Sequence, residues 1–165
     1  MGLKSRRYPI VVPRGHDCIT FFLGSKERYA EYFNEKLPGC FWYTASWIDN
    51  AQMPCERMDR RELEYYREKG YDEDDIEFLI ENSHQWIINY RNAAYIRMPF
   101  FDRPHYAEFT REAAAYHKWG YSEVEGDLSL LQRFVDGQWD EREFLVVEPG
   151  KTIMPSYDEN IIKAE

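Results

Sequence analysis

The sequence predicts an α/β fold, a Rossmann-like three-layer arrangement with a mainly parallel sheet of about five strands and flanking helices. Short apolar runs alternate along the chain with stretches of helical periodicity, which is the order that βαβ units produce. The apolar runs at residues 10–12 and 145–147 are continuous rather than alternating, as in strands that are covered on both faces. Both observations favour a parallel sheet.

Five runs are predicted as strands because they are short and mostly rich in β-branched or aromatic residues. In chain order they span residues 8–12, 40–44, 93–96, 121–125 and 144–147. In an open α/β sheet ligands bind beyond the carboxyl ends of the strands. The loops that directly follow these five runs are therefore the first place to look for a site.

Five helices are predicted between and after these strands, at residues 26–36, 59–69, 74–91, 104–119 and 127–135. Ser25 and Asp127 are suitable N-caps, and Gly70 and Gly120 stand where helices end. The acidic run at residues 72–75 is interpreted as a solvated first helical turn, where carboxylates complement the helix dipole. Strands and helices together predict one α/β domain at residues 1–152.

Residues 153–165 are expected to form a C-terminal tail, with Pro155 discouraging another strand. The chain opens almost directly on a buried-looking strand, so a neighbouring N-terminal portion is expected to be missing or supplied by another chain. An open strand edge of this kind also favours a homo-oligomer.

Composition excludes several classes of protein. The chain has 165 residues, 44% of them hydrophobic, and a net charge of −9, so nucleic acid is not an expected partner. No apolar stretch is long enough to span a membrane, and residues 1–7 lack the apolar core of a secretory signal. Three cysteines without a CxxC pair fit a reducing cytoplasm.

The loop after the first strand is the densest candidate site. Arg14, Gly15, His16, Asp17 and Cys18 bring a guanidinium, an imidazole, a carboxylate and a thiol close together. Arg14 is suited to binding an anion, and a nearby Arg14 or His16 would favour the reactive thiolate of Cys18. Each residue also has a structural interpretation: His16 bonding a carbonyl, Asp17 capping a turn, and Cys18 filling a small apolar space.

Three residues from the other loops are predicted to border the same cavity, namely Trp47, Asp127 and Lys151. Their loops emerge at the same edge of a parallel sheet, and Lys151 with Arg14 would form a positive wall for an anionic ligand. Trp47 packing at the domain edge and Asp127 capping its helix are the structural alternatives.

A metal site is supported only by His16 and Cys18, which provide at most two ligands. No HExxH, CxxC or HxH spacing is present, and structural zinc normally needs four ligands. His84, His105 and His117 fall in helical stretches and are interpreted as surface or packing residues.

Several segments resemble an uncharacterised prokaryotic family known as a domain of unknown function. The resemblance rests on residues 13–19, 23–29, 38–39, 126–131 and 144–153. It implies a His-Asp-Cys family motif, which falls on His16, Asp17 and Cys18. It also implies that this chain corresponds to the C-terminal portion of longer members, and that the genes occur in methanogens and other anaerobes near corrinoid methyltransferase genes.

These observations support three functional hypotheses. The first is a ligand- or metal-binding accessory protein of anaerobic corrinoid and one-carbon metabolism, using Arg14, His16, Asp17 and Cys18. Its cofactor would be a transition metal or a corrinoid, and its partner a corrinoid protein or a methyltransferase. The second is a thiol-dependent or metal-assisted transferase with Cys18 attacking or ligating and His16 as base. The third is a structural subunit without a small-molecule site.

Overall fold

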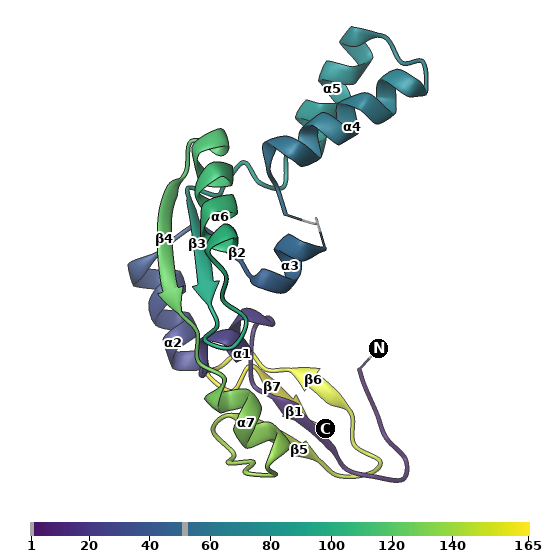
Figure 1. Cartoon of the computed structure of the whole chain (residues 1–165). Helices are drawn as coiled ribbons and strands as arrows, with labels where there is room; N and C mark the ends of the chain where they lie inside the picture. The colour runs from purple at the N-terminus through teal and green to yellow at the C-terminus, as the bar shows by residue number, and fades with distance from the viewer. Residues whose placement is uncertain (1, 51–52) are drawn as a thin grey trace. The chain divides into compact units, whose positions relative to one another are not determined.

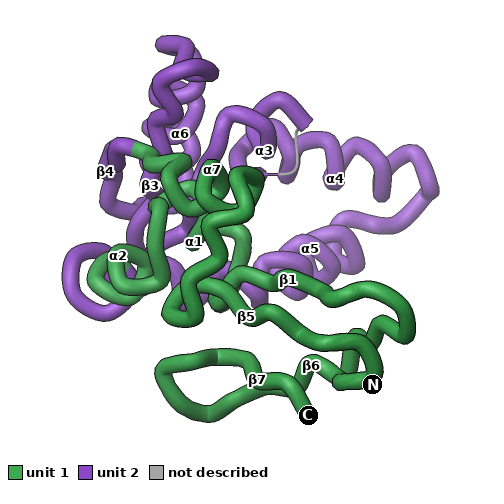
Figure 2. The backbone as a smooth tube through the Cα atoms, turned by 90° about the horizontal axis from the view of Figure 1, so that it is seen from below, with its two compact units in different colours: residues 1–32, 126–165 green, residues 33–125 purple. Residues whose placement is uncertain are grey.

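The computed structural model describes residues 2–50 and 53–165. The chain divides into two compact units. Unit 1 consists of Met1–Tyr32 and Gly126–Glu165, and unit 2 of Phe33–Glu125. Figure 2 colours unit 1 green and unit 2 purple. Unit 1 is therefore built from two segments that are far apart in the sequence.

Unit 2 contains the parallel sheet. Its strands are β2 (Cys40–Tyr43), β3 (Asn92–Arg97) and β4 (Gly120–Glu125), in the order β2-β3-β4. Both strand pairings are parallel, and the arrows of Figure 1 show this common direction. Three of the five predicted strands are therefore confirmed in this unit, and so is their predicted parallel pairing.

The core of unit 2 forms where β3 packs against helix α6 (Pro104–His117). Tyr43 and Tyr95 are fully buried there, beside Ala113 and Ala114. The small alanine side chains of α6 allow the helix to approach the sheet closely, so the large tyrosine rings fill the remaining space. The structure confirms the helix predicted here. It ends at His117, because the next residue, Lys118, has a left-handed φ of 59°.

The other helices of unit 2 are α3 (Ala45–Asp49), α4 (Glu56–Glu68) and α5 (Glu73–Ser83). Helices α4 and α5 lie side by side (Figure 1). The Asp72 carboxylate accepts a hydrogen bond from the Asp75 backbone N–H at 2.9 Å, so it is an N-cap. The acidic run therefore starts a helix, as predicted, although that helix ends eight residues before the predicted end at Arg91.

The described residues of unit 1 form two antiparallel strand pairs and three helices. Strand β1 (Ile10–Pro13) pairs with β5 (Phe144–Val147), and β6 (Ile153–Pro155) pairs with β7 (Ile162–Ala164). The helices are α1 (Ile19–Leu23), α2 (Lys26–Glu31) and α7 (Ser129–Val135). Helix α2 continues into a wider π-helical turn over Tyr32–Lys36, and Ser25 caps its start as predicted, accepting the Arg28 N–H at 3.1 Å.

The predicted sheet of about five mainly parallel strands is not observed. The fold is mixed α/β with a parallel three-stranded sheet, and the first and last predicted strands pair antiparallel with each other. The reason is that the last predicted strand is buried on one face only. Val146 is 42% exposed, whereas Val147 is 1% exposed, so this continuous apolar run is covered on one face only. A run of valines satisfies either environment, and the sequence pattern did not distinguish them.

The tail predicted at residues 153–165 is instead a β-hairpin. Strands β6 and β7 form it, and Thr152 and Glu165 exchange backbone hydrogen bonds of 2.6 and 2.9 Å at its open end. Pro155 is the last residue of β6, a position where the missing N–H interrupts no further pairing. In the part of the chain that the structure describes, no helix combines the length and apolarity needed to cross a membrane.

Candidate functional site

Arg14 follows β1 directly and is buried in unit 1, with 9% of its surface exposed. Its backbone N–H donates to the Glu143 carbonyl at 2.7 Å, which extends the β1–β5 pairing by one residue. The antiparallel pairing therefore fixes where the Arg14 side chain begins. A guanidinium held this deeply needs hydrogen-bond acceptors, because an unpaired buried charge is strongly unfavourable.

Backbone carbonyls provide those acceptors. The Arg14 Nε donates to the Glu141 carbonyl at 2.9 Å. Its Nη1 donates to the carbonyls of Asn160 and Ile162 at 2.8 and 2.5 Å. Between these two acceptors lies Ile161, whose φ of 65° is left-handed and strained for a β-branched residue. Arg14 thus holds the strained β6–β7 turn from both sides.

A cavity of about 1060 Å³ lies beside this turn, entirely within unit 1. Four segments line it: the end of β1, helix α2, the segment leading into and through β5, and the β6–β7 turn. The lining residues are Arg14, His16, Lys26, Glu27, Ala30, Trp139, Glu141, Arg142, Phe144, Leu145, Val146, Asp158, Glu159, Asn160 and Ile161.

The cavity wall carries both signs of charge. The Lys26 ammonium donates to the Glu159 carbonyl at 3.0 Å, which engages one of its three hydrogens. The Arg142 Nε pairs with the Glu27 carboxylate at 3.0 Å, and the two side chains are 74% and 43% exposed. Exposed ion pairs of this kind contribute about 0.2–1 kcal/mol to the stability of the fold. Arg142 can therefore exchange its partner for a ligand group at low cost.

Trp139 gives the wall a flat apolar surface. Its indole N–H donates to the Phe134 carbonyl at 2.8 Å, so the polar edge of the ring is already satisfied and its orientation is fixed. The side chain is 43% exposed. An anchored, half-open aromatic face is suited to stacking on a planar ligand.

The predicted site residues divide into two groups. Arg14 and His16 line the cavity, whereas Asp17 and Cys18 are not among the described residues that do so. Asp17 accepts the Ile19 N–H at 2.8 Å and the Tyr29 hydroxyl at 2.9 Å, which fixes the start of α1. Asp17 thus has the capping role that the sequence offered as its structural alternative.

Cys18 is exposed, in contrast to Cys40 and Cys55, which are buried. Partial burial raises the pKa of the Cys18 thiol, and the neighbouring Asp17 carboxylate raises it further. The expectation that Arg14 or His16 would favour the thiolate is therefore reversed: the nearest charge is negative, and Arg14 is engaged by carbonyls. A raised pKa leaves less thiolate at neutral pH.

Alkylation of the native protein with iodoacetamide tests this environment. Cys18 is expected to be modified first because it is exposed, but more slowly at pH 7 than an unhindered thiol. Asp17→Asn keeps the hydrogen-bond acceptor and removes the charge, so it should lower the Cys18 pKa and increase the rate about two- to threefold. Mass spectrometry of the modified peptides over a pH series measures both effects. A Cys18 pKa below that of a free thiol would contradict the assignment.

Gly15, Asp127, Lys151 and Trp47 lie outside the set of described residues that line the cavity. Gly15 lies close to the buried Thr20 side chain, which a Cβ atom would approach to 3.1 Å. Asp127 accepts the Ser129 N–H at 2.7 Å at the start of α7, a bond that lowers the pKa of its carboxyl.

Lys151 is exposed in the turn after β5. Trp47 belongs to α3 of unit 2, where it packs against the hydrophobic core of that unit. Of the predicted site residues, Arg14 and His16 are the two that line the cavity of unit 1.

Among the described residues, no group of three or more His, Cys, Asp or Glu side chains is arranged to hold a metal ion. The predicted ligands His16 and Cys18 thus gain no third partner within residues 2–50 and 53–165. A mononuclear site built from this loop would need ligands from elsewhere.

Sequence reasoning missed Lys26, Trp139 and Arg142, which line the cavity. Lys26 was assigned to a helix and the other two to a connecting segment. The only sequence signal was a tryptophan in an otherwise polar stretch at residues 136–143. Their proximity depends on the antiparallel β1–β5 pairing, which the predicted parallel sheet did not contain.

Comparison with known proteins finds a match to a family model described as a protein of unknown function (DUF1638), covering residues 1–135. The match includes Arg14, His16 and Lys26 but ends before Trp139 and the β6–β7 turn. No curated protein and no solved structure matches the chain.

Proposed function

We propose that this chain, which belongs to the DUF1638 family of proteins of unknown function, binds a flat, polar small molecule in the cavity of unit 1. The observation that carries the proposal is the cavity itself. Its volume of about 1060 Å³ lies just above the range of about 300–1,000 Å³ that is typical of small-molecule sites. Its wall also combines a fixed indole face with exchangeable charged groups.

The wall indicates the kind of ligand. Trp139 offers a planar apolar contact, while Lys26, His16 and Arg142 offer hydrogen-bond donors. Acidic side chains, among them Glu27, balance these positive groups, so a highly charged anion gains little. A planar ring with amide or single carboxylate groups around it matches this mixture of surfaces.

A corrinoid has this character, because its flat macrocycle carries amide side chains. We therefore propose a corrinoid as the ligand and an accessory role in anaerobic one-carbon metabolism, with a corrinoid protein or methyltransferase as partner and the cytoplasm as compartment. When bound, the corrinoid would supply methyl-transfer chemistry at its cobalt. In this proposal Trp139 contacts the ring, and Lys26 and Arg142 bind its periphery.

The transferase alternative has weaker support. Cys18 carries a raised pKa and is not among the described residues that line the cavity, so neither its acidity nor its position favours nucleophilic attack on a ligand there. A structural subunit without a ligand remains the alternative if the cavity binds nothing. The binding experiment separates it from the proposal.

Equilibrium dialysis with hydroxocobalamin, followed by its visible absorbance, tests the proposal. The wild-type protein is expected to bind one equivalent. Trp139→Ala should weaken binding about tenfold, since an aromatic contact contributes about 0.5–1.5 kcal/mol beyond its buried area. Trp86→Ala is the matched control, because Trp86 is exposed in unit 2. Absence of binding, or equal losses in the two variants, would refute the proposed site.

A further inference from the structure

A second, smaller pocket lies within unit 2 and is independent of the cavity described above. It has a volume of about 290 Å³. The turn after α5 and the residues around the end of α6 form it. The residues that matter here are His84, Ile87, Ile88, Arg91, His117 and Trp119. The sequence placed these histidines in separate helices, and the fold brings them together.

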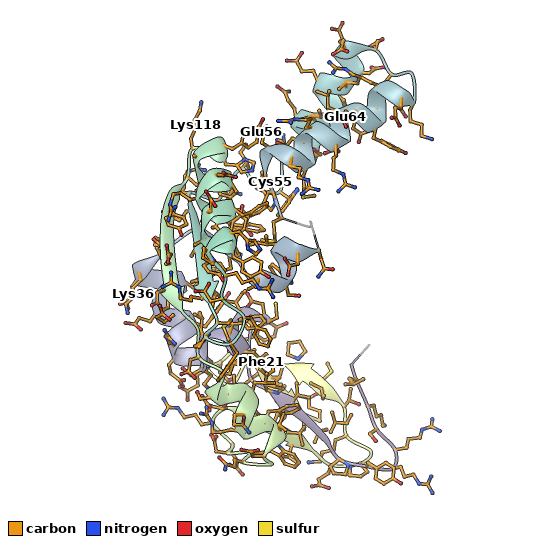
Figure 3. The ribbon with its side chains drawn as sticks, in the orientation of Figure 1. Phe21, Lys36, Cys55, Glu56, Glu64 and Lys118 are labelled. Atoms are coloured by element: carbon orange, nitrogen blue, oxygen red, sulfur yellow. The ribbon has the colours of Figure 1, made fainter. Side chains whose placement is uncertain are left out.

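His84 is paired with a largely buried carboxylate. Its Nε2 lies 3.0 Å from Asp59 Oδ1, and the Asp59 side chain is 13% exposed. Asp59 belongs to α4, whose start is marked in Figure 3 by Cys55 and Glu56, while Lys118 marks the end of α6. A carboxylate beside one imidazole nitrogen holds the ring in a fixed orientation. The pair thus leaves Nδ1 as the nitrogen of His84 that a ligand can contact.

His117 lies beside this pair. Its ring stacks on Trp119 with centroids 4.6 Å apart and meets His84 edge-on at 6.3 Å. Burial lowers its pKa, although Asp59 opposes the effect. Within the described residues, Nε2 of His117 and Oδ2 of Asp59 are buried without hydrogen-bond partners. The unpartnered Nε2 of His117 is therefore a polar atom of the pocket that a ligand could satisfy.

Arg91 supplies a fixed positive charge to the same pocket. Its backbone is held by the Gly39 carbonyl, which accepts its N–H at 2.8 Å. Its Nη1 donates to the carbonyls of Ile88 and Tyr90 at 2.6 and 2.8 Å. In the described structure these bonds engage one corner of the guanidinium, so Nε and Nη2 are the edge that can take a carboxylate bidentately.

We propose that this pocket binds a small monocarboxylate, with its carboxylate between His84 and Arg91 and its short alkyl chain against Ile87, Ile88 and Trp119. The volume of about 290 Å³ suits a small ligand, since it lies just below the range of about 300–1,000 Å³ of known ligand sites. Glu81, an exposed acid in the lining, opposes an anion and therefore limits the affinity.

Titration of the full chain with butyrate, followed by calorimetry, tests the proposal, with butyramide as the uncharged analogue. Butyrate is expected to bind and butyramide to bind at least about tenfold more weakly, because a paired charge is lost. Arg91→Gln should weaken butyrate binding about tenfold, whereas Arg61→Gln, an exposed arginine of α4, should leave it unchanged. Glu81→Gln should strengthen it about two- to threefold by removing a like charge.

A second readout needs no variant. In the wild-type protein, butyrate should shift the NMR resonances of the His84 ring and leave those of His105, an exposed histidine of the same unit, in place. Equal binding of butyrate and butyramide, equal effects of Arg91→Gln and Arg61→Gln, or an unshifted His84 ring would each overturn the assignment.

Discussion

Arg14→Ala is expected to lower the free energy of unfolding by about 3 kcal/mol, because hydrogen bonds to a charged group contribute about 1.5–3 kcal/mol and carbonyls lose their donors. The affected acceptors are the carbonyls of Glu141, Asn160 and Ile162. With Arg14 gone, the turn around the strained Ile161 keeps its local contacts and the exposed hydrogen bond from Lys26 to the Glu159 carbonyl, so the β6–β7 turn should open more readily. The variant should therefore lose both stability and the cavity wall.

Urea denaturation followed by circular dichroism measures the change, with Arg6→Ala as the control, since Arg6 is exposed in the same unit. Arg14→Lys should recover only part of the loss, because an ammonium group lacks the planar fork that reaches carbonyls on two sides. Equal stability of Arg14→Ala and Arg6→Ala would show that Arg14 does not hold the turn.

Phe144→Ala is expected to destabilise the protein by about 3–5 kcal/mol, the range for removing a buried phenylalanine. Phe144 is 1% exposed and stacks on Phe134 with ring centroids 6.0 Å apart. It begins β5 and lines the cavity, so its loss removes packing between α7 and the β1–β5 pair. The remaining void adds to the lost transfer free energy.

Val146→Ala is the matched control for this prediction. Val146 lies two residues along the same strand but is 42% exposed, so its truncation should change the free energy of unfolding by less than about 1 kcal/mol. Urea denaturation of both variants checks the difference. A similar decrease in the free energy of unfolding for Phe144→Ala and Val146→Ala would mean that β5 does not bury Phe144 as described.

Local signals in the sequence were sufficient to predict most helices and strands. Ser25 and Asp72 cap helices because their side chains accept backbone N–H groups, and this chemistry depends on neighbours only. The three strands of unit 2 were recognisable from apolar runs separated by helices. Such features need no knowledge of how distant segments meet.

The candidate site depended on pairings that no local signal specifies. Arg14 was predicted to face a ligand, yet its guanidinium binds carbonyls of residues 141, 160 and 162, more than 120 positions away in the chain. The antiparallel β1–β5 register and the β6–β7 hairpin create those contacts. Because the valines of β5 fit parallel and antiparallel sheets equally, the sequence left this choice open.

Hydrogen exchange of the full chain with and without hydroxocobalamin tests the central claim, ligand binding in the cavity of unit 1, most directly. Binding should slow the exchange of backbone amides in residues 14–16, 139–146 and 158–161, because these segments line the cavity and a bound ligand suppresses their local opening. Unchanged exchange in these segments, or protection confined to unit 2, would contradict the claim.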